Sequence, residues 1–227
     1  MSKINFYDFV KTKKVHNPGF ANHSITIPFR MIIAAPSGSG KTNALLGLIY
    51  HFDKTFQEII VCVKSADEPL YELLENKVKN VRVYENGDVP DLSEFSKFDE
   101  KTKKYKRIDN LQRLIVFDDL ITSKNANIKA AEYYIKARKL GFSMCYISQE
   151  FYAIPKIIRT NSTLFLLGRN LLNRDLKMIL SAFPSRLSLD EFAQLYNDLL
   201  NEQLDTLIIN IEKRNVRKNI TGDIINV

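Results

Sequence analysis

The chain has 227 residues, 45% of them hydrophobic and 26% charged, a globular composition that excludes the disordered and fibrous classes of protein. No apolar run reaches the roughly 18 residues that span a membrane. Residues 1–14, MSKINFYDFVKTKK, lack the apolar core of a secretory signal, so we expect neither membrane insertion nor secretion. The formal net charge of +7 favours a polyanionic partner, although many proteins that bind no nucleic acid carry a similar charge.

Three segments are expected along the chain: a basic N-terminal arm at 1–24, one domain at 25–211 and a basic tail at 212–227. In the domain, apolar runs typical of buried strands alternate with amphipathic helical patterns, without an internal repeat. The predicted strands are residues 24–27, 31–35, 58–63, 81–84, 114–117, 142–148, 164–167 and 206–211, and helices are predicted after 42 and over 67–77, 125–140, 173–183 and 188–200. This alternation predicts an α/β domain with a mostly parallel sheet and helices on both faces.

A glycine-rich loop connects the first apolar strand to the first helix. Gly38 and Gly40 allow backbone conformations that point N–H groups at phosphate oxygens, and the helix dipole adds to the attraction. Lys41 can then reach the β- and γ-phosphates, and the Thr42 hydroxyl can ligate Mg²⁺. The predicted nucleotide-binding residues are Pro36, Ser37, Gly38, Ser39, Gly40, Lys41, Thr42 and Asn43, and the alternative is a chance Gly/Ser turn.

This loop departs from the pattern G-x-x-x-x-G-K-[ST] at one position, because Ala35 stands where the first glycine is usual. A small side chain is tolerable there if φ at Ala35 is negative. We therefore treat the loop as a variant of the pattern.

Two acids end the strand at 114–117. Because the chain turns at the end of a strand, Asp118 can hold Mg²⁺ while Asp119 faces the attacking water. A second acid at this point favours an ATPase that polarises water. The alternative is a pair of acids that cap the following helix.

Gln149 directly follows the strand at 142–148. Ligands of parallel sheets bind at the carboxyl ends of the strands, so Gln149 is predicted to sense the γ-phosphate or to orient water. Alternatively, it caps the helix that follows.

A basic run, DEKTKKYKR, lies at 99–107 within a polar stretch that we expect to be a loop at 85–112. The candidate DNA contacts in this run are Lys101, Lys103, Lys104, Lys106 and Arg107. Such a run is either a solvated surface or the lining of a groove for a phosphate backbone, with Tyr105 available for stacking.

The order of these parts, a phosphate-loop strand, a strand with two acids and a strand ending in glutamine, looks like the RecA-like, additional-strand class of P-loop NTPases. Three runs carry the resemblance: 27–33 leading into 36–43, 115–120, and 137–142 leading to Ser148-Gln149. Within that class, the chain resembles the FtsK–HerA superfamily, and specifically the genome-packaging ATPases of poxviruses, other large DNA viruses and virophages. The resemblance spans about residues 13–170.

This resemblance implies a Mg²⁺-dependent ATPase that moves double-stranded DNA into a preformed capsid. It implies a homo-oligomeric ring, a pentamer or a hexamer, with ATP hydrolysed at the seams between subunits, a capsid vertex or portal component as partner, and the host-cell cytoplasm or the virion as location. Arg138 is then the first candidate for an arginine that acts across the seam, and Arg159 and Arg169 are reserves. Alternatively, Arg138 complements a helix dipole.

Two other functions stay open. One is a helicase or a cellular or plasmid-type DNA pump of the same superfamily. The other is an assembly switch that oligomerises on ATP and barely turns over, which Asp119 and Gln149 argue against. A small-molecule kinase is less compatible, because no arginine-rich lid follows the second strand.

Overall fold

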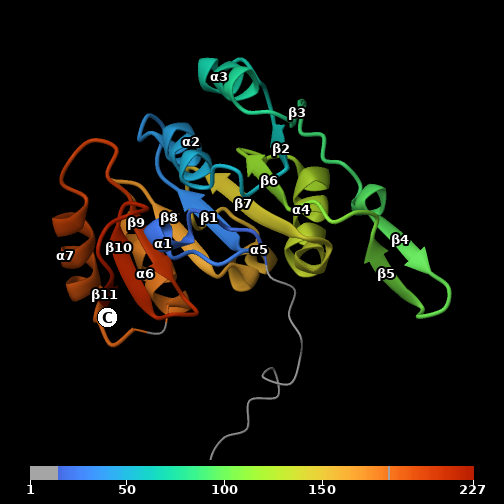
Figure 1. The fold of residues 1–227 in the computed structure, drawn as a ribbon. Helices are drawn as coiled ribbons and strands as arrows, with labels where there is room; N and C mark the ends of the chain where they lie inside the picture. The colour runs from blue at the N-terminus through green and yellow to red at the C-terminus, as the bar shows by residue number, and fades with distance from the viewer. Residues whose placement is uncertain (1–14, 184) are drawn as a thin grey trace, which may run out of the picture.

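The computed structural model describes residues 15–183 and 185–227. Its main sheet has nine strands in the order β11-β10-β9-β8-β1-β7-β6-β2-β3 (Figure 1). Six strands run parallel: β1 (Arg30–Ala34), β2 (Glu58–Val63), β3 (Val81–Tyr84), β6 (Arg113–Asp118), β7 (Phe142–Ser148) and β8 (Leu164–Leu167). An antiparallel extension follows β8: β9 (Leu207–Asn210), β10 (Asn215–Lys218) and β11 (Ile225–Asn226).

Helices cover both faces of this sheet. They are α1 (Phe20–His23), α2 (Lys41–His51), α3 (Pro69–Lys77), α4 (Lys124–Lys136), α5 (Lys156–Asn161), α6 (Asn173–Ala182) and α7 (Leu189–Leu199), with 3₁₀ turns η2 (Leu92–Phe95) and η3 (Ala137–Leu140). Alternate residues of β1 point to opposite faces: Met31 and Ile33 pack with α2 and α3, and Ile32 packs with α4 to α7. The prediction of a mostly parallel sheet with helices on both faces is confirmed.

β7 separates the glycine-loop strand β1 from the acidic strand β6. All seven residues of β7 are buried, as expected for a strand covered on both faces, which also explains its mostly apolar sequence. This order is that of the additional-strand class, and it brings the carboxyl ends of the three strands to one edge of the sheet.

Residues 24–27 are not a strand, contrary to the sequence prediction. The Ile25 amide donates to the Nδ1 atom of His23 at 3.0 Å, so a side chain satisfies the donor that a strand partner would otherwise take. Of the expected arm, residues 1–14 lie outside the described residues. The part from residue 15 onward packs on the domain through α1, whose His23 ring lies 4.1 Å from the Phe52 ring.

Residues 212–227, expected as a basic tail, carry the strands β10 and β11. Val216 is fully buried and pairs with Ile209 of β9, so the basic residues around it belong to an ordered strand of the sheet. The prediction of a tail relied on the Lys and Arg residues of this segment. The strands were overlooked because a short strand with one buried apolar residue has a weak sequence pattern.

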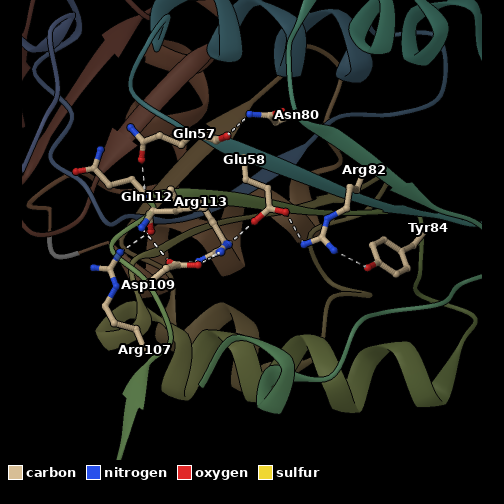
Figure 2. Close-up of polar contacts among 10 residues, drawn as sticks. Gln57, Glu58, Asn80, Arg82, Tyr84, Arg107, Asp109, Gln112 and Arg113 are labelled. Carbon is tan, nitrogen blue, oxygen red and sulfur yellow. Dashed lines mark hydrogen bonds and ion pairs between the residues drawn. The ribbon is translucent and has the colours of Figure 1, made fainter. Parts of the chain in front are cut away.

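The polar stretch 85–112 contains η2 and a hairpin of β4 (Ser96–Asp99) and β5 (Lys104–Arg107), where the sequence suggested only a loop. Figure 1 shows this hairpin projecting from the body of the domain. At its base, the buried Arg113 guanidinium donates to Asp109 at 2.9 Å and pairs with Glu58 (Figure 2). This network lies at the amino-terminal ends of β2 and β6, and therefore opposite the glycine loop.

None of the helices within residues 15–183 and 185–227 combines the length and the apolar character needed to cross a bilayer.

Candidate active site

The glycine loop lies between β1 and α2. Gly38 and Gly40 have φ values of 72° and 80°, in the region that favours glycine. α2 begins at Lys41, and no side chain caps its first amides. The Lys41 ammonium donates to the Pro36 carbonyl at 3.1 Å, within the loop itself. These unpaired helix amides and the adjacent ammonium are suited to bind phosphate.

Ala35, which stands where the first glycine of the loop is usual, fits because the residue packed against it is Gly168. The described residues with positive φ do not include Ala35, so its side chain causes no backbone strain. A Cβ atom added to Gly168, at the end of β8, would lie 2.5 Å from the Ala35 Cβ atom. The Ala35 methyl group therefore occupies space that Gly168 leaves free.

The two acids lie at the same edge of the sheet as the loop. Asp118 is the last residue of β6 and pairs in register with Ile147 of β7. The Asp119 amide donates to the Ile147 carbonyl at 3.3 Å, and Asp119 has a φ of 51°, a left-handed conformation that Asp adopts more readily than most residues. This turn makes Asp118 half-buried and Asp119 exposed, so the two carboxylates have different surroundings.

Gln149 follows β7 at this edge, and its Nε2 atom lies 3.5 Å from the Asp119 Oδ2 atom. Both side chains are exposed, and they come from neighbouring strands. The structure thus places Gln149 beside Asp119. Gln149 lies at the carboxyl end of β7, which is the neighbour of β1 and its glycine loop.

The charges of the site act on one another. Burial lowers the pKa of the Lys41 ammonium, whereas the carboxylates of Asp118, Asp119 and Glu68 oppose this shift. Burial, with smaller contributions from Glu68 and Asp119, raises the pKa of the Asp118 carboxyl to about 6, against a hydrogen bond from Tyr71 and the charge of Lys41. Three carboxylates facing one ammonium leave an excess of negative charge, which favours a further cation.

The oxygen donors at this edge suit Mg²⁺. A hydroxyl and carboxylates are hard ligands, and Mg²⁺ is usually held by one or two carboxylates together with nucleotide phosphates and water. Within residues 15–183 and 185–227, no three His, Cys, Asp or Glu side chains converge closely enough to hold a metal ion by themselves. The Thr42 hydroxyl and the Asp118 carboxylate therefore fit a Mg²⁺ ion that arrives with a nucleotide.

The three candidate arginines lie in different places. Arg138 is exposed in η3, just before β7 begins, and so lies at the opposite end of the strands from the glycine loop of its own subunit. Arg159 is half-buried, donates to the Met178 sulfur and lies with its guanidinium carbon 5.9 Å from the centre of the Phe151 ring. Arg169 follows Gly168 at the edge that carries the loop.

Residues 19–216 match the family model described as Poxvirus A32 protein. The chain belongs to the poxvirus A32 protein family. The sequence-based resemblance to poxvirus-type packaging ATPases is thereby confirmed. The comparison with curated proteins returned no match.

Solved structures share the fold of this A32-family chain. The genome packaging NTPase B204 from Sulfolobus turreted icosahedral virus 2, in complex with sulfate, has 13% sequence identity and a TM-score of 0.58, with 89% of this chain and 100% of that chain covered. The pCW3 conjugation coupling protein TcpA, with ATPγS, has 15% identity and a TM-score of 0.58, with 87% and 62% covered. At these identities, the likeness shows the P-loop ATPase fold.

Two residues that contact the candidate site were missed from the sequence: Glu68, directly before α3, and Tyr71, in its first turn. The Thr42 hydroxyl donates to the Glu68 Oε2 atom at 2.9 Å, and the Tyr71 phenol donates to the Asp118 Oδ2 atom. Asp67-Glu68-Pro69 suggested only the first turn of a helix, because an acid and a proline are common there. No local pattern could have paired Tyr71 with an acid 47 residues away.

Leu204, in the loop before β9, is a third missed residue of this A32-family site. A Cβ atom added to Gly40 would lie 2.5 Å from the Leu204 Cδ2 atom. Leu204 is 50% exposed and has a φ of 70°, which is unusual for a bulky residue. The last third of the chain, which no sequence motif assigned to the site, thus contributes a side chain that covers part of the glycine loop.

Proposed function

We propose that this chain is the ATP-hydrolysing motor that packages double-stranded viral DNA into a preformed capsid. One observation carries the proposal: a single edge of the sheet brings together a glycine loop with uncapped helix amides, two acids and Gln149. Membership of the A32 family supports it, as does the shared fold with B204, a genome packaging NTPase with structures in complex with AMP and AMPPCP.

In the proposed mechanism, the loop amides and Lys41 bind the phosphates of ATP. Thr42 and Asp118 hold Mg²⁺, which when bound neutralises charge that develops on the β- and γ-phosphates. This assignment uses the uncapped start of α2 and the half-buried carboxylate at the end of β6. The nucleotide then lies with its terminal phosphate toward β6 and β7, where the remaining polar side chains are.

Asp119 acts as general base for the attacking water, because it is exposed and turned away from the position of Asp118. Such a base contributes about 10² to 10⁴ in rate. Gln149, 3.5 Å from Asp119, orients the same water and senses whether the γ-phosphate is present. Arg138 acts on the site of the neighbouring subunit in a ring, since it lies far from its own loop along the strands.

The test is the rate of ATP hydrolysis of the full chain against added duplex DNA, with the oligomer size measured in the same buffer. We expect Mg²⁺-dependent turnover that duplex DNA stimulates, in a ring-sized species. In Asp119→Asn, ATP binding should persist while turnover falls about 10² to 10⁴-fold.

Other results would favour other functions. A ring that binds ATP without turnover, with or without DNA, would indicate an assembly switch. ATP-dependent separation of DNA strands would indicate a helicase. Wild-type turnover in Asp119→Asn would overturn the assignment of the base.

A further inference from the structure

The first residues of α3 contact both groups to which the proposed function assigns Mg²⁺. Glu68, directly before the helix, accepts the Thr42 hydroxyl hydrogen at 2.9 Å. Tyr71, in the first turn, donates its phenol hydrogen to the Asp118 Oδ2 atom. One short segment thus holds two side chains that come from different elements, α2 and β6.

The geometry of the first contact leaves Thr42 free to bind a cation. A hydroxyl has one hydrogen and two lone pairs, and here the hydrogen is directed to the Glu68 carboxylate. The lone pairs must therefore point elsewhere. With Glu68 as a charged acceptor, the hydroxyl is held by a hydrogen bond roughly twice as strong as a neutral one.

The second contact works in the same way on Asp118. A carboxylate has two oxygens, and the Tyr71 phenol occupies only Oδ2, which leaves Oδ1 for a cation. Tyr71 is 2% exposed, so its ring has a fixed place in the core. The carboxylate is thereby fixed in orientation by a side chain that is itself rigid.

We propose that Glu68 and Tyr71 are positioning residues that orient Thr42 and Asp118 toward the Mg²⁺ ion of the bound nucleotide. This inference rests on the proposed function, since it assumes that Thr42 and Asp118 hold the metal. It adds that the helix α3 forms the outer shell of the metal site. Outer-shell residues typically change metal affinity about 10 to 100-fold when they are replaced.

The test compares Tyr71→Phe and Glu68→Gln with the wild type. Binding of a fluorescent, non-hydrolysable ATP analogue is titrated over a series of Mg²⁺ concentrations and, separately, in EDTA. We expect each variant to need about 10 to 100-fold more Mg²⁺ for half-maximal enhancement of binding, with affinity in EDTA unchanged. Electron paramagnetic resonance of Mn²⁺ in the ternary complex should show the same weakening.

Two matched variants control for stability and charge. Tyr133→Phe removes another buried phenol, which donates to the Pro90 carbonyl at 3.2 Å and so bonds to neither Thr42 nor Asp118. Glu72→Gln removes a carboxylate from the exposed side of α3. Neither should change the Mg²⁺ dependence, although Tyr133→Phe should lower the melting temperature.

The inference is overturned if Tyr71→Phe and Glu68→Gln weaken binding equally with Mg²⁺ and in EDTA, because that pattern reports a general structural role. It is also overturned if neither variant changes the Mg²⁺ titration. Failure of the proposed function looks different, since the wild type itself would then show no Mg²⁺ dependence of nucleotide binding. Because Glu68 is exposed, Glu68→Gln should fold even if Tyr71→Phe does not.

Discussion

At the scale of single residues, the contact of Ala35 with Gly168 explains how a phosphate loop keeps its shape without its first glycine. Ala35 is 2% exposed, so its methyl group must find space inside the protein. That space exists because the backbone of residue 168 carries no side chain. The loop and the end of β8 are therefore complementary in shape.

We predict that Gly168→Ala destabilises the fold by about 1 to 3 kcal/mol through overpacking, and that Ala35→Gly in the same chain restores most of this loss. Denaturant unfolding of both single variants and the double variant measures the coupling. Gly47→Ala is the matched control, since a Cβ atom there would meet nothing within 4 Å and α2 should gain about 0.5 to 1 kcal/mol. Additive effects at 35 and 168 would contradict this prediction.

At the scale of elements, α1 packs the start of the described chain against the domain through the side chain of His23. Its ring is fully buried beside Phe52, and burial lowers the pKa of His23 to about 4, with smaller contributions from Arg217 and His51. The folded protein therefore holds this imidazole neutral, as its role as acceptor for the Ile25 amide also requires.

This lowered pKa has a consequence for stability. Between the ordinary value of about 6.5 and the folded value of about 4, the unfolded chain binds a proton that the folded chain does not. The contribution of the neutral, buried His23 to the free energy of unfolding should be complete above pH 6.5 and should decline as the pH falls toward 4. In denaturant unfolding at pH 7 and pH 5, His23→Asn, which keeps an acceptor, should lose less stability on acidification than the wild type. His16→Asn, at an exposed site, should behave as the wild type does.

The hairpin β4–β5 separates its side chains by face. Its register pairs Lys97 with Lys106 and Asp99 with Lys104, so these four side chains lie on one face of the ribbon. Lys106 also forms an ion pair with Asp99, which reduces the free charge. Arg107 lies on the other face and is half-buried, with its guanidinium against Gly141. Of the candidate DNA contacts, Lys104 and Lys106 are therefore better placed than Arg107.

We predict that replacing Lys97, Lys104 and Lys106 by Gln reduces the slope of log affinity for duplex DNA against log salt concentration by up to about 3, because each phosphate contact contributes about 0.9. Arg107→Gln is the control and should change the slope little. Fluorescence anisotropy of labelled duplex DNA at several salt concentrations measures this slope. An unchanged slope in the triple variant would favour a solvated surface for the hairpin.

At the scale of the whole molecule, the opposite ends of the parallel strands carry different parts of the proposed machine. The phosphate loop and the acids lie at the carboxyl ends, and Arg138 lies at the amino ends with the base of the hairpin. A subunit cannot bring Arg138 to its own glycine loop without unfolding η3 and β7. If this arginine acts in catalysis, it must do so on a neighbour.

We predict that Arg138→Ala and Lys41→Ala, each inactive alone, regain activity when the two kinds of subunit are mixed. In rings that assemble at random from both kinds, roughly one subunit interface in four joins an intact Lys41 to an intact Arg138. An arginine that acts in trans raises the rate by about 10³ to 10⁵. The ATPase rate of the mixture, with ring assembly checked in the same sample, measures this. No recovery in intact mixed rings would favour a helix-capping role for Arg138, and the same mixture with Arg169→Ala tests a reserve candidate.

The sequence alone predicted the local features of the proposed phosphate site: the glycines of the loop, the two acids after an apolar run, and the glutamine after the next one. These are readable because each depends on a few neighbouring residues and on the end of a strand. Buried parallel strands also have continuous apolar sequences, so the fold class followed from the same signal.

Only the tertiary structure decided that Glu68 and Tyr71 contact Thr42 and Asp118, that Leu204 covers part of the loop, and that Arg138 lies at the far end of the strands. Thr42 and Glu68 are 26 residues apart, and Tyr71 and Asp118 are 47 apart. Contacts over such separations depend on strand order and helix packing, which the local pattern of either partner does not encode.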